Sequence, residues 1–197
     1  MRSKSTTLCF LLLYLGAGCK TGYDLETDAL TRFTLQKSDT IYHFQAVKPA
    51  EKNPKVNQSI FYYWFRPDTI LVTRGGFDGK LLNGEYKSFY PNKNLKESGR
   101  FKAGLKTGEW KSWYSNGELQ SVTKWQAGKK EGKFQEFTPD GDKQRTGNYK
   151  KDKLSGYITT YSGGTEAYKE KYREGEPVIK KEKSDSRKKK APDAAQY

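Results

Sequence analysis

The sequence contains only two cysteines and one histidine among 197 residues, which leaves little material for metal or covalent chemistry. Zinc sites need clusters of cysteine and histidine at set spacings, and the sequence has none. The cysteines are Cys9 and Cys19, so no pair remains once a leader of 18 residues is removed. An exported domain would therefore fold without a disulfide. We expect no metal site and no cofactor.

Aliphatic residues are also scarce. Hydrophobic residues make up 34% of the chain and charged residues 30%, while 14% is aromatic and 19 residues are glycine. A large aliphatic core is excluded by this composition. Aromatic residues alternating with glycine-rich turns favour strands and tight turns over helices.

One apolar run, Leu8 to Leu15, stands near the start, after the basic residues Arg2 and Lys4. It is too short to span a bilayer and predicts a signal peptide over residues 1–18. The segment "LGAGC" that ends at Cys19 resembles the lipobox of bacterial lipoproteins, in which the cysteine is diacylated. The resemblance implies lipidation of Cys19, and Lys20 after it, in place of Asp, implies outer-membrane sorting. The alternative is ordinary signal cleavage with Cys19 incidental.

The second half of the chain repeats with a period of 24 residues. Matching strings such as "GEYKSFYPN" and "GEWKSWYSN" begin at four evenly spaced glycines. A more divergent copy of the repeat precedes them, so five units are expected to start near residues 60, 84, 108, 132 and 156. The residues predicted to mark repeat turns are Gly84, Asn92, Gly108, Asn116, Gly117, Gly132, Asp140, Gly141 and Gly156.

Three aromatic columns recur in phase with the glycines. They consist of Tyr86, Trp110 and Phe134; Phe89, Trp113, Phe137 and Tyr161; and Phe101, Trp125, Tyr149 and Tyr172. Each unit predicts a β-hairpin, because Asn-Gly and Asp-Gly supply the positive φ of two-residue hairpin turns. We expect an all-β, single-layer antiparallel meander in which the Phe89 column stacks with the Phe101 column. The aromatic columns are most simply the core of this sheet.

The segment from Tyr114 to Leu119, "YSNGEL", together with Phe89 to Leu95, carries a further resemblance. These residues resemble the bacterial variant of the MORN-repeat family, and the resemblance covers residues 60 to about 176. It implies a repeat scaffold for interactions and, because many proteins with this variant are labelled antitoxins, a neutralised partner protein. Repeats of this kind serve many unrelated functions, so the fold alone does not assign one.

Two segments lie outside the array, which spans residues 60–179. Residues 19–59 predict a lipidated N-terminus, two cap strands and a polar linker, since open sheets need protected edges. Residues 180–197 predict a disordered basic tail, which is either a solvated tail or a contact for an anionic surface. Its basic residues are Lys180, Lys181, Lys183, Arg187, Lys188, Lys189 and Lys190.

No constellation of catalytic residues is present. His43 is the single histidine, and a lone histidine in an aromatic strand is more often structural than catalytic. Removal of residues 1–18 lowers the formal net charge from +14 to +12, and lysines alternate with the aromatics, which indicates a sheet with one wetted face. An export signal argues against nucleic acid as the partner.

The leading hypothesis is a non-enzymatic, lipid-anchored scaffold of the cell envelope that binds an acidic protein or an anionic envelope surface. One alternative is a module that binds glycans or quaternary amines in aromatic grooves. The other, from the resemblance alone, is an immunity-type protein that binds a toxin.

Overall fold

The computed structural model describes residues 30–49 and 56–179, and this part of the chain is all-β, with thirteen strands and no helix. Every strand pairing is antiparallel. The strands are β1 (Thr31–Lys37), β2 (Thr40–Val47), β3 (Phe61–Arg66), β4 (Thr69–Arg74), β5 (Lys80–Phe89), β6 (Leu95–Lys102), β7 (Leu105–Trp113), β8 (Leu119–Gln126), β9 (Lys129–Phe137), β10 (Lys143–Lys150), β11 (Lys153–Ser162), β12 (Thr165–Arg173) and β13 (Glu176–Pro177).

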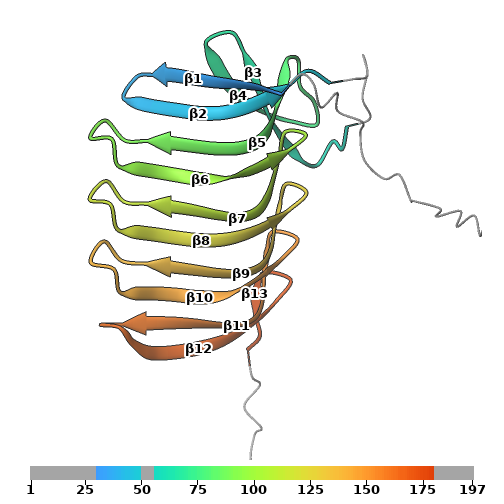
Figure 1. Cartoon of the computed structure of the whole chain (residues 1–197). Helices are drawn as coiled ribbons and strands as arrows, with labels where there is room; N and C mark the ends of the chain where they lie inside the picture. The colour runs from blue at the N-terminus through green and yellow to red at the C-terminus, as the bar shows by residue number, and fades with distance from the viewer. Residues whose placement is uncertain (1–29, 50–55, 180–197) are drawn as a thin grey trace, which may run out of the picture.

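Consecutive hairpins stack along one axis, from β1–β2 at one end to β11–β12 at the other (Figure 1). The sheet order runs β1-β2-β5-β6 and then in chain order to β13. The divergent unit near residue 60 forms a hairpin, β3–β4, but this hairpin lies outside the main strand order. Strand β2, and not β4, is the main partner of β5. Strand β3 pairs with β5 only through Trp64 and Phe65. The expected meander of five equivalent units is therefore four hairpins preceded by the β1–β2 cap.

The loops that follow β5, β7 and β9 are three-residue hairpin loops, where two-residue turns were expected. In the first, the Lys93 N–H donates to the Tyr90 carbonyl and the Tyr90 N–H donates to the Asn94 carbonyl. Lys93 has a φ of 68°, and Gly117 and Gly141 hold the same place with φ of 95° and 88°. Since only one loop residue has positive φ, the loop is a type I turn with a bulge.

Side chains of these loops bond to the loop of the next hairpin. The Tyr90 hydroxyl donates to the Trp113 carbonyl at 2.9 Å, and the Asn92 amide donates to the Ser115 carbonyl at 2.7 Å. Tyr114 and Asn116 make the same bonds one repeat later, to Phe137 and Pro139. The asparagine and tyrosine columns therefore hold successive repeats together along the axis.

The two-residue turns with positive φ at both positions lie at the other end of the hairpins. Ala103 and Gly104 have φ of 50° and 76°, and Ala127 and Gly128 have 47° and 79°. Both positions positive defines a type I′ turn. The Gly104 N–H donates back to the Leu82 carbonyl and the Gly128 N–H to the Lys106 carbonyl, so these turns also join one repeat to the previous one.

Gly84, Gly108, Gly132 and Gly156 were expected in turns, and this prediction is wrong. They lie inside β5, β7, β9 and β11 with φ between 70° and 93°. Between β6 and β7 the register passes from Ser98↔Lys111 to Arg100↔Thr107, so β7 holds two extra residues at Gly108. Each glycine thus marks a bulge where the sheet bends. At Gly108 a Cβ would meet nothing within 4 Å, so the positive φ is what requires glycine.

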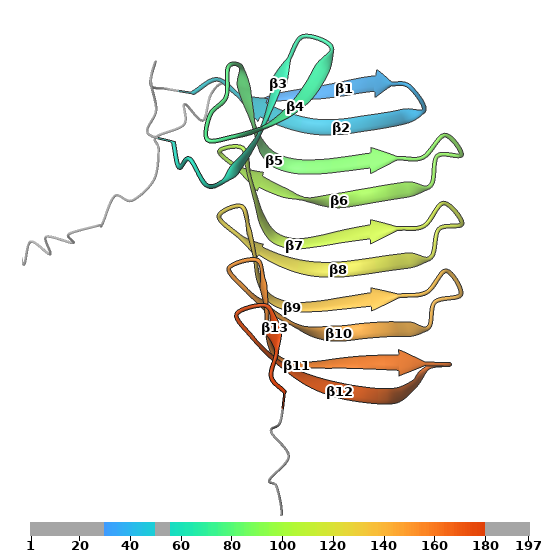
Figure 2. The same ribbon diagram turned by 180° about the vertical axis from the view of Figure 1, so that it is seen from behind.

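The register separates the side chains into two faces. The inner face carries the first and third aromatic columns, because Tyr86 pairs with Gly99 and Gly84 with Phe101. The first column is the core: Tyr86, Trp110, Phe134 and Ile158 are 9%, 3%, 1% and 3% exposed. The opposite, outer face carries the residues that alternate with these along each strand, and Figures 1 and 2 show the stack of strands from its two sides.

The β3–β4 hairpin lies beside the bent end of the first repeats (Figure 2). The Tyr63 N–H donates to the Gly104 carbonyl, and the Tyr63 ring lies 4.9 Å from Phe101. On its other side, buried Tyr62 and Trp64 pack with Leu81. The hairpin therefore covers the start of the inner face and leaves the later repeats uncovered.

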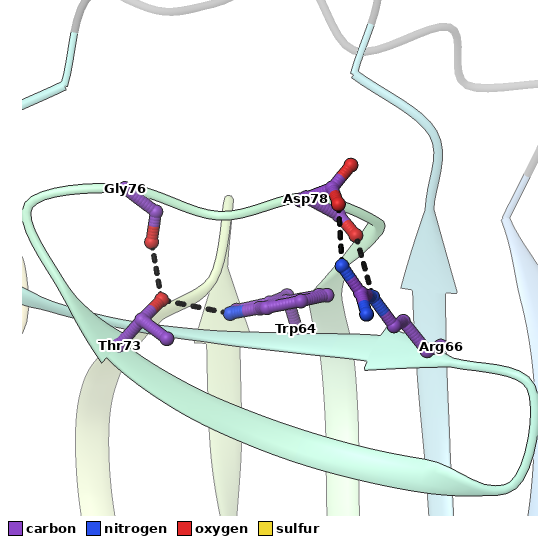
Figure 3. Close-up of polar contacts among 5 residues, drawn as sticks. All are labelled: Trp64, Arg66, Thr73, Gly76 and Asp78. Atoms are coloured by element: carbon purple, nitrogen blue, oxygen red, sulfur yellow. Dashed lines mark hydrogen bonds and ion pairs between the residues drawn. The ribbon is translucent and has the colours of Figure 1, made fainter.

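A polar clamp closes the loop after this hairpin (Figure 3). The Trp64 indole N–H donates to Thr73 Oγ1 at 2.8 Å, and the Thr73 hydroxyl donates to the Gly76 carbonyl. Arg66 lies over the Trp64 ring, 5.0 Å from its centroid, and pairs with Asp78. The polar groups of this glycine-rich loop are therefore bound by side chains of the β3–β4 hairpin itself.

Candidate functional site

The aromatic columns divide between the two faces, and this overturns the expected stacking. Phe101 makes ring contacts with Tyr86 at 5.4 Å and Trp110 at 4.8 Å, all on the inner face. Phe134 and Tyr149 repeat the contact at 4.7 Å. Phe89 follows inner-face Ser88 in β5 and lies on the outer face, so the Phe89 column cannot stack with the Phe101 column.

Lys106 occupies an aromatic cage on the inner face. Its Nζ lies 3.9 Å from the Trp110 ring centroid, 5.2 Å from Trp125 and 5.5 Å from Tyr63. The same Nζ lies 2.7 Å from Glu97 Oε1, and only 11% of the lysine side chain is exposed. A lysine opposite Phe101 in the register therefore fills the kind of ring cluster that a quaternary amine would need.

The next repeat carries a weaker copy of this arrangement. Lys130 Nζ lies 4.8 Å from the Tyr149 ring and 5.9 Å from Trp125, without an ion-pair partner in the described part of the chain. Lys106, Lys130 and Glu97 were not singled out from the sequence. Their 24-residue spacing was available for the two lysines, but their position over the rings depends on which residue each faces across the strands.

Burial and neighbouring charge act on three tyrosines of this face. Burial, reinforced by Glu97, raises the pKa of both Tyr63 and Tyr86 above the ordinary value for tyrosine. Burial also raises the pKa of Tyr149, and Glu136 adds to the shift while Arg145 opposes it. Each phenol is thus held neutral and packed, which suits a structural role.

The outer strip is the candidate functional surface. We define it as the two side-chain rows of the outer face that run across β5 to β12 between the bend and the hairpin loops. It holds seven basic and two acidic side chains: Lys87, Arg100, Lys111, Lys124, Lys133, Lys169 and Lys171, with Glu85 and Glu109. The matching two rows of the inner face hold Arg145 against Glu97, Glu136 and Glu170.

Both acidic residues of the outer strip are already paired within it. Glu85 Oε1 lies 3.2 Å from Arg100, and Glu109 Oε1 lies 3.1 Å from Lys111. The other five lysines make no ion pair with the residues that the structure describes. The positive charge of this strip is therefore not neutralised by its own carboxylates.

The second aromatic column borders the strip on the side of the hairpin loops. Phe89, Trp113, Phe137 and Tyr161 are each half-buried, and Phe89 also meets the His43 ring at 5.2 Å. His43 is exposed on β2, directly opposite Lys87 of β5. Half-buried rings beside unpaired lysines present both apolar and cationic contacts to a partner.

Several sequence predictions fall elsewhere. The signal peptide, Cys19 and the basic tail from Lys180 lie outside the described residues. Asn92, Asn116, Gly117, Asp140 and Gly141 lie in or beside the hairpin loops, and Tyr172 is a half-buried inner-face residue. Residues 30–49 and 56–179 include no cluster of metal-ligating side chains. Over those same ranges, the structure contains no helix with the length and hydrophobicity to cross a bilayer.

Comparison with known families identifies three repeats. Residues 82–103, 106–126 and 130–151 each match the MORN repeat variant. These segments run from the bend of one odd-numbered strand to the turn before the next, so each holds one hairpin of the stack. A search of curated proteins finds no match to the chain.

Proposed function

We propose, starting from the three matched MORN repeat variants, that the protein is a non-enzymatic scaffold of the cell envelope. Repeats of this kind generally mediate contacts with proteins or membranes and are generally non-catalytic. In this proposal the chain is exported and attached to the outer membrane through lipidated Cys19. The stacked hairpins then display the outer strip to an acidic protein or to an anionic envelope surface.

The charge difference between the outer strip and the two inner-face rows behind it carries the proposal. The outer strip has five more basic than acidic side chains, and the matching inner rows have two more acidic than basic. Near an anionic membrane each basic side chain contributes up to about 1 kcal/mol at low salt, so a strip of this charge supports binding without any deep pocket. Its contribution should fall as added salt screens it.

The lipid anchor rests on the sequence around Cys19. Strand β1 begins at Thr31, twelve residues later, so the connection can reach at most about 40 Å. Such a tether would keep the array close to the membrane surface. Metabolic labelling with a fatty acid should mark the wild-type chain and not Cys19→Ala, and equal labelling of both would exclude the anchor.

The interaction is tested by affinity purification of the tagged full-length protein from gently solubilised, cross-linked membranes. The test variant combines Lys124→Gln, Lys133→Gln and Lys171→Gln, all exposed in the outer strip. The control removes the same charge outside the outer strip and the aromatic column beside it, through Lys48→Gln, Arg74→Gln and Lys151→Gln, all exposed. A partner lost only from the test variant supports the proposal, while equal recovery from both contradicts it.

The alternatives give different results in this experiment. Recovery of one toxin-like protein in fixed ratio would favour the immunity-type function. A quaternary-amine ligand on the inner face would have to displace Lys106, which already contacts Trp110 and Glu97. For that reason we propose the outer strip, and not the inner-face rings, as the binding surface.

A further inference from the structure

A hollow of about 300 Å³ opens on the surface of β1, β2 and β5, at the end of the outer strip. Polar side chains line much of it: Arg32, Thr34, His43, Gln45, Glu85 and Lys87. The hollow involves the cap strands and lies before the repeats matched by the family comparison, apart from the part of β5 that it borders.

The strand register brings these groups together from three strands. Thr34 faces His43, and His43 faces Lys87, so the three form one row across the sheet. Arg32 faces Gln45 in the neighbouring row. Directly opposed residues have Cβ atoms about 5 Å apart and diagonal neighbours about 7–8 Å apart, within reach of long side chains.

Two cations of the hollow are uncompensated. Glu85, the one carboxylate among the lining residues, is paired with Arg100 at 3.2 Å. Neither Arg32 nor Lys87 makes an ion pair with another described residue. Both side chains are exposed at the surface, so they are free to close on a ligand.

Neutral donors surround the two cations. The Thr34 hydroxyl and the His43 ring can each donate a hydrogen bond. Gln45 Oε1 accepts the Glu85 N–H at 3.0 Å, which leaves the amide nitrogen of Gln45 to donate as well. The guanidinium fork of Arg32 suits an oxyanion in two-point contact.

We propose that this hollow binds the phosphate group of a phosphate monoester. A phosphoryl group of this kind carries a charge of about −1.5 to −2 near neutral pH, with three terminal oxygens. It therefore matches two unpaired cations and several donors better than a singly charged carboxylate does. The site shares Lys87 and Glu85 with the outer strip but adds Arg32, Thr34, His43 and Gln45 of the cap strands, so it can bind a soluble ester whether or not the strip has a partner.

The test uses His43 as a reporter, since it is the one histidine of the chain and gives a single set of imidazole signals. The ring carbon and proton shifts of the full chain are followed by NMR at constant pH and ionic strength, with glycerol 3-phosphate as the probe. We expect a saturable shift. Acetate, as a carboxylate probe, should give a weaker one, and a response equal to that of sodium chloride would overturn the proposal.

Two test variants should weaken phosphate binding, and two control variants should not. Arg32→Gln and Lys87→Gln each remove one charged contact and should raise the dissociation constant about tenfold. Lys124→Gln and Lys133→Gln remove the same charge from the outer strip far along the stack and should leave it unchanged. Equal weakening by both pairs would mean diffuse attraction and not a site.

A third variant keeps the result interpretable if an arginine or lysine replacement disturbs the fold. Thr34→Glu places a carboxylate opposite His43 and should abolish the shift with an unchanged circular dichroism spectrum. Vesicles containing phosphatidic acid then distinguish the source of the phosphate. Competition between these vesicles and glycerol 3-phosphate would identify a lipid head group as a ligand, while binding of the soluble ester alone would identify a soluble one.

Discussion

Replacing Gly99 by alanine should disrupt the packed centre of the inner face. A Cβ at this position would lie 2.3 Å from two atoms of the Trp110 indole and 2.7 Å from a third. The indole has no room to retreat, because it is 3% exposed and packs on Phe101 at 4.8 Å. Lys106 Nζ lies on it at 3.9 Å, and the indole N–H donates to the Arg100 carbonyl at 3.2 Å.

The cost follows from adding one methyl group to a filled core. Overpacking of this kind typically costs 1–3 kcal/mol, and we expect about 2–3 kcal/mol here because the cage around Lys106 must shift with the ring. For a chain of this size that corresponds to a fall in melting temperature of roughly 5–10 °C. Urea and thermal unfolding, followed by circular dichroism and tryptophan fluorescence, measure both quantities.

Gly76→Ala is the matched control. A Cβ at Gly76 would meet nothing within 4 Å, and neither glycine has a φ in the left-handed region. The control should change the free energy of unfolding by less than about 0.5 kcal/mol. If Gly99→Ala were as mild as Gly76→Ala, the close approach of Trp110 to the backbone would be wrong.

Three further predictions concern single side chains. Lys106→Gln should lower the free energy of unfolding by about 2 kcal/mol, because it leaves Glu97 without its ion-pair partner. Lys130→Gln breaks no ion pair and should lower it by less than about 1 kcal/mol, with both values measured by urea unfolding. Burial raises the pKa of Tyr86, so the neutral phenol stabilises the fold fully at pH values below the unfolded-state pKa near 10. As the pH rises above that value this stabilisation is lost, by up to about 1.4 kcal/mol per pH unit. The alkaline fall in the free energy of unfolding should therefore be shallower in Tyr86→Phe, as measured by unfolding at pH 9 to 12. Ala127→Asn should raise the melting temperature, corresponding to about 0.5–1 kcal/mol, because alanine occupies a φ of 47° in a type I′ turn; an unchanged value would argue against that turn.

The period of 24 residues was sufficient to predict hairpins and an all-β sheet. It could not distinguish a positive φ inside a strand from one in a turn, since both select glycine. Gly84 and Gly108 were therefore assigned to turns although they mark bends within strands. The type of the turns at Gly104 and Gly128 was not predicted, because Ala103 and Ala127 are not typical residues of type I′ turns.

Long-range pairing explains the remaining differences. The placement of β3–β4 depends on whether β4 or β2 pairs with β5, and local propensities do not determine that choice. The same holds for the Lys106 cage, which exists because Lys106 faces Phe101 across two strands. The hollow at His43 was equally hidden, since Arg32, His43 and Lys87 are distant in the sequence and meet only through the register.

The central claim is that the outer strip, and not the surface in general, contacts the partner or the envelope. Lysine acetylation of native membranes, followed by mass spectrometry and compared with the purified protein, measures this directly. The account predicts that Lys124, Lys133 and Lys169 lose reactivity in the membrane sample, while Lys48 and Lys151, which lie outside the strip, keep it. Uniform reactivity of all five lysines in both samples would contradict the account.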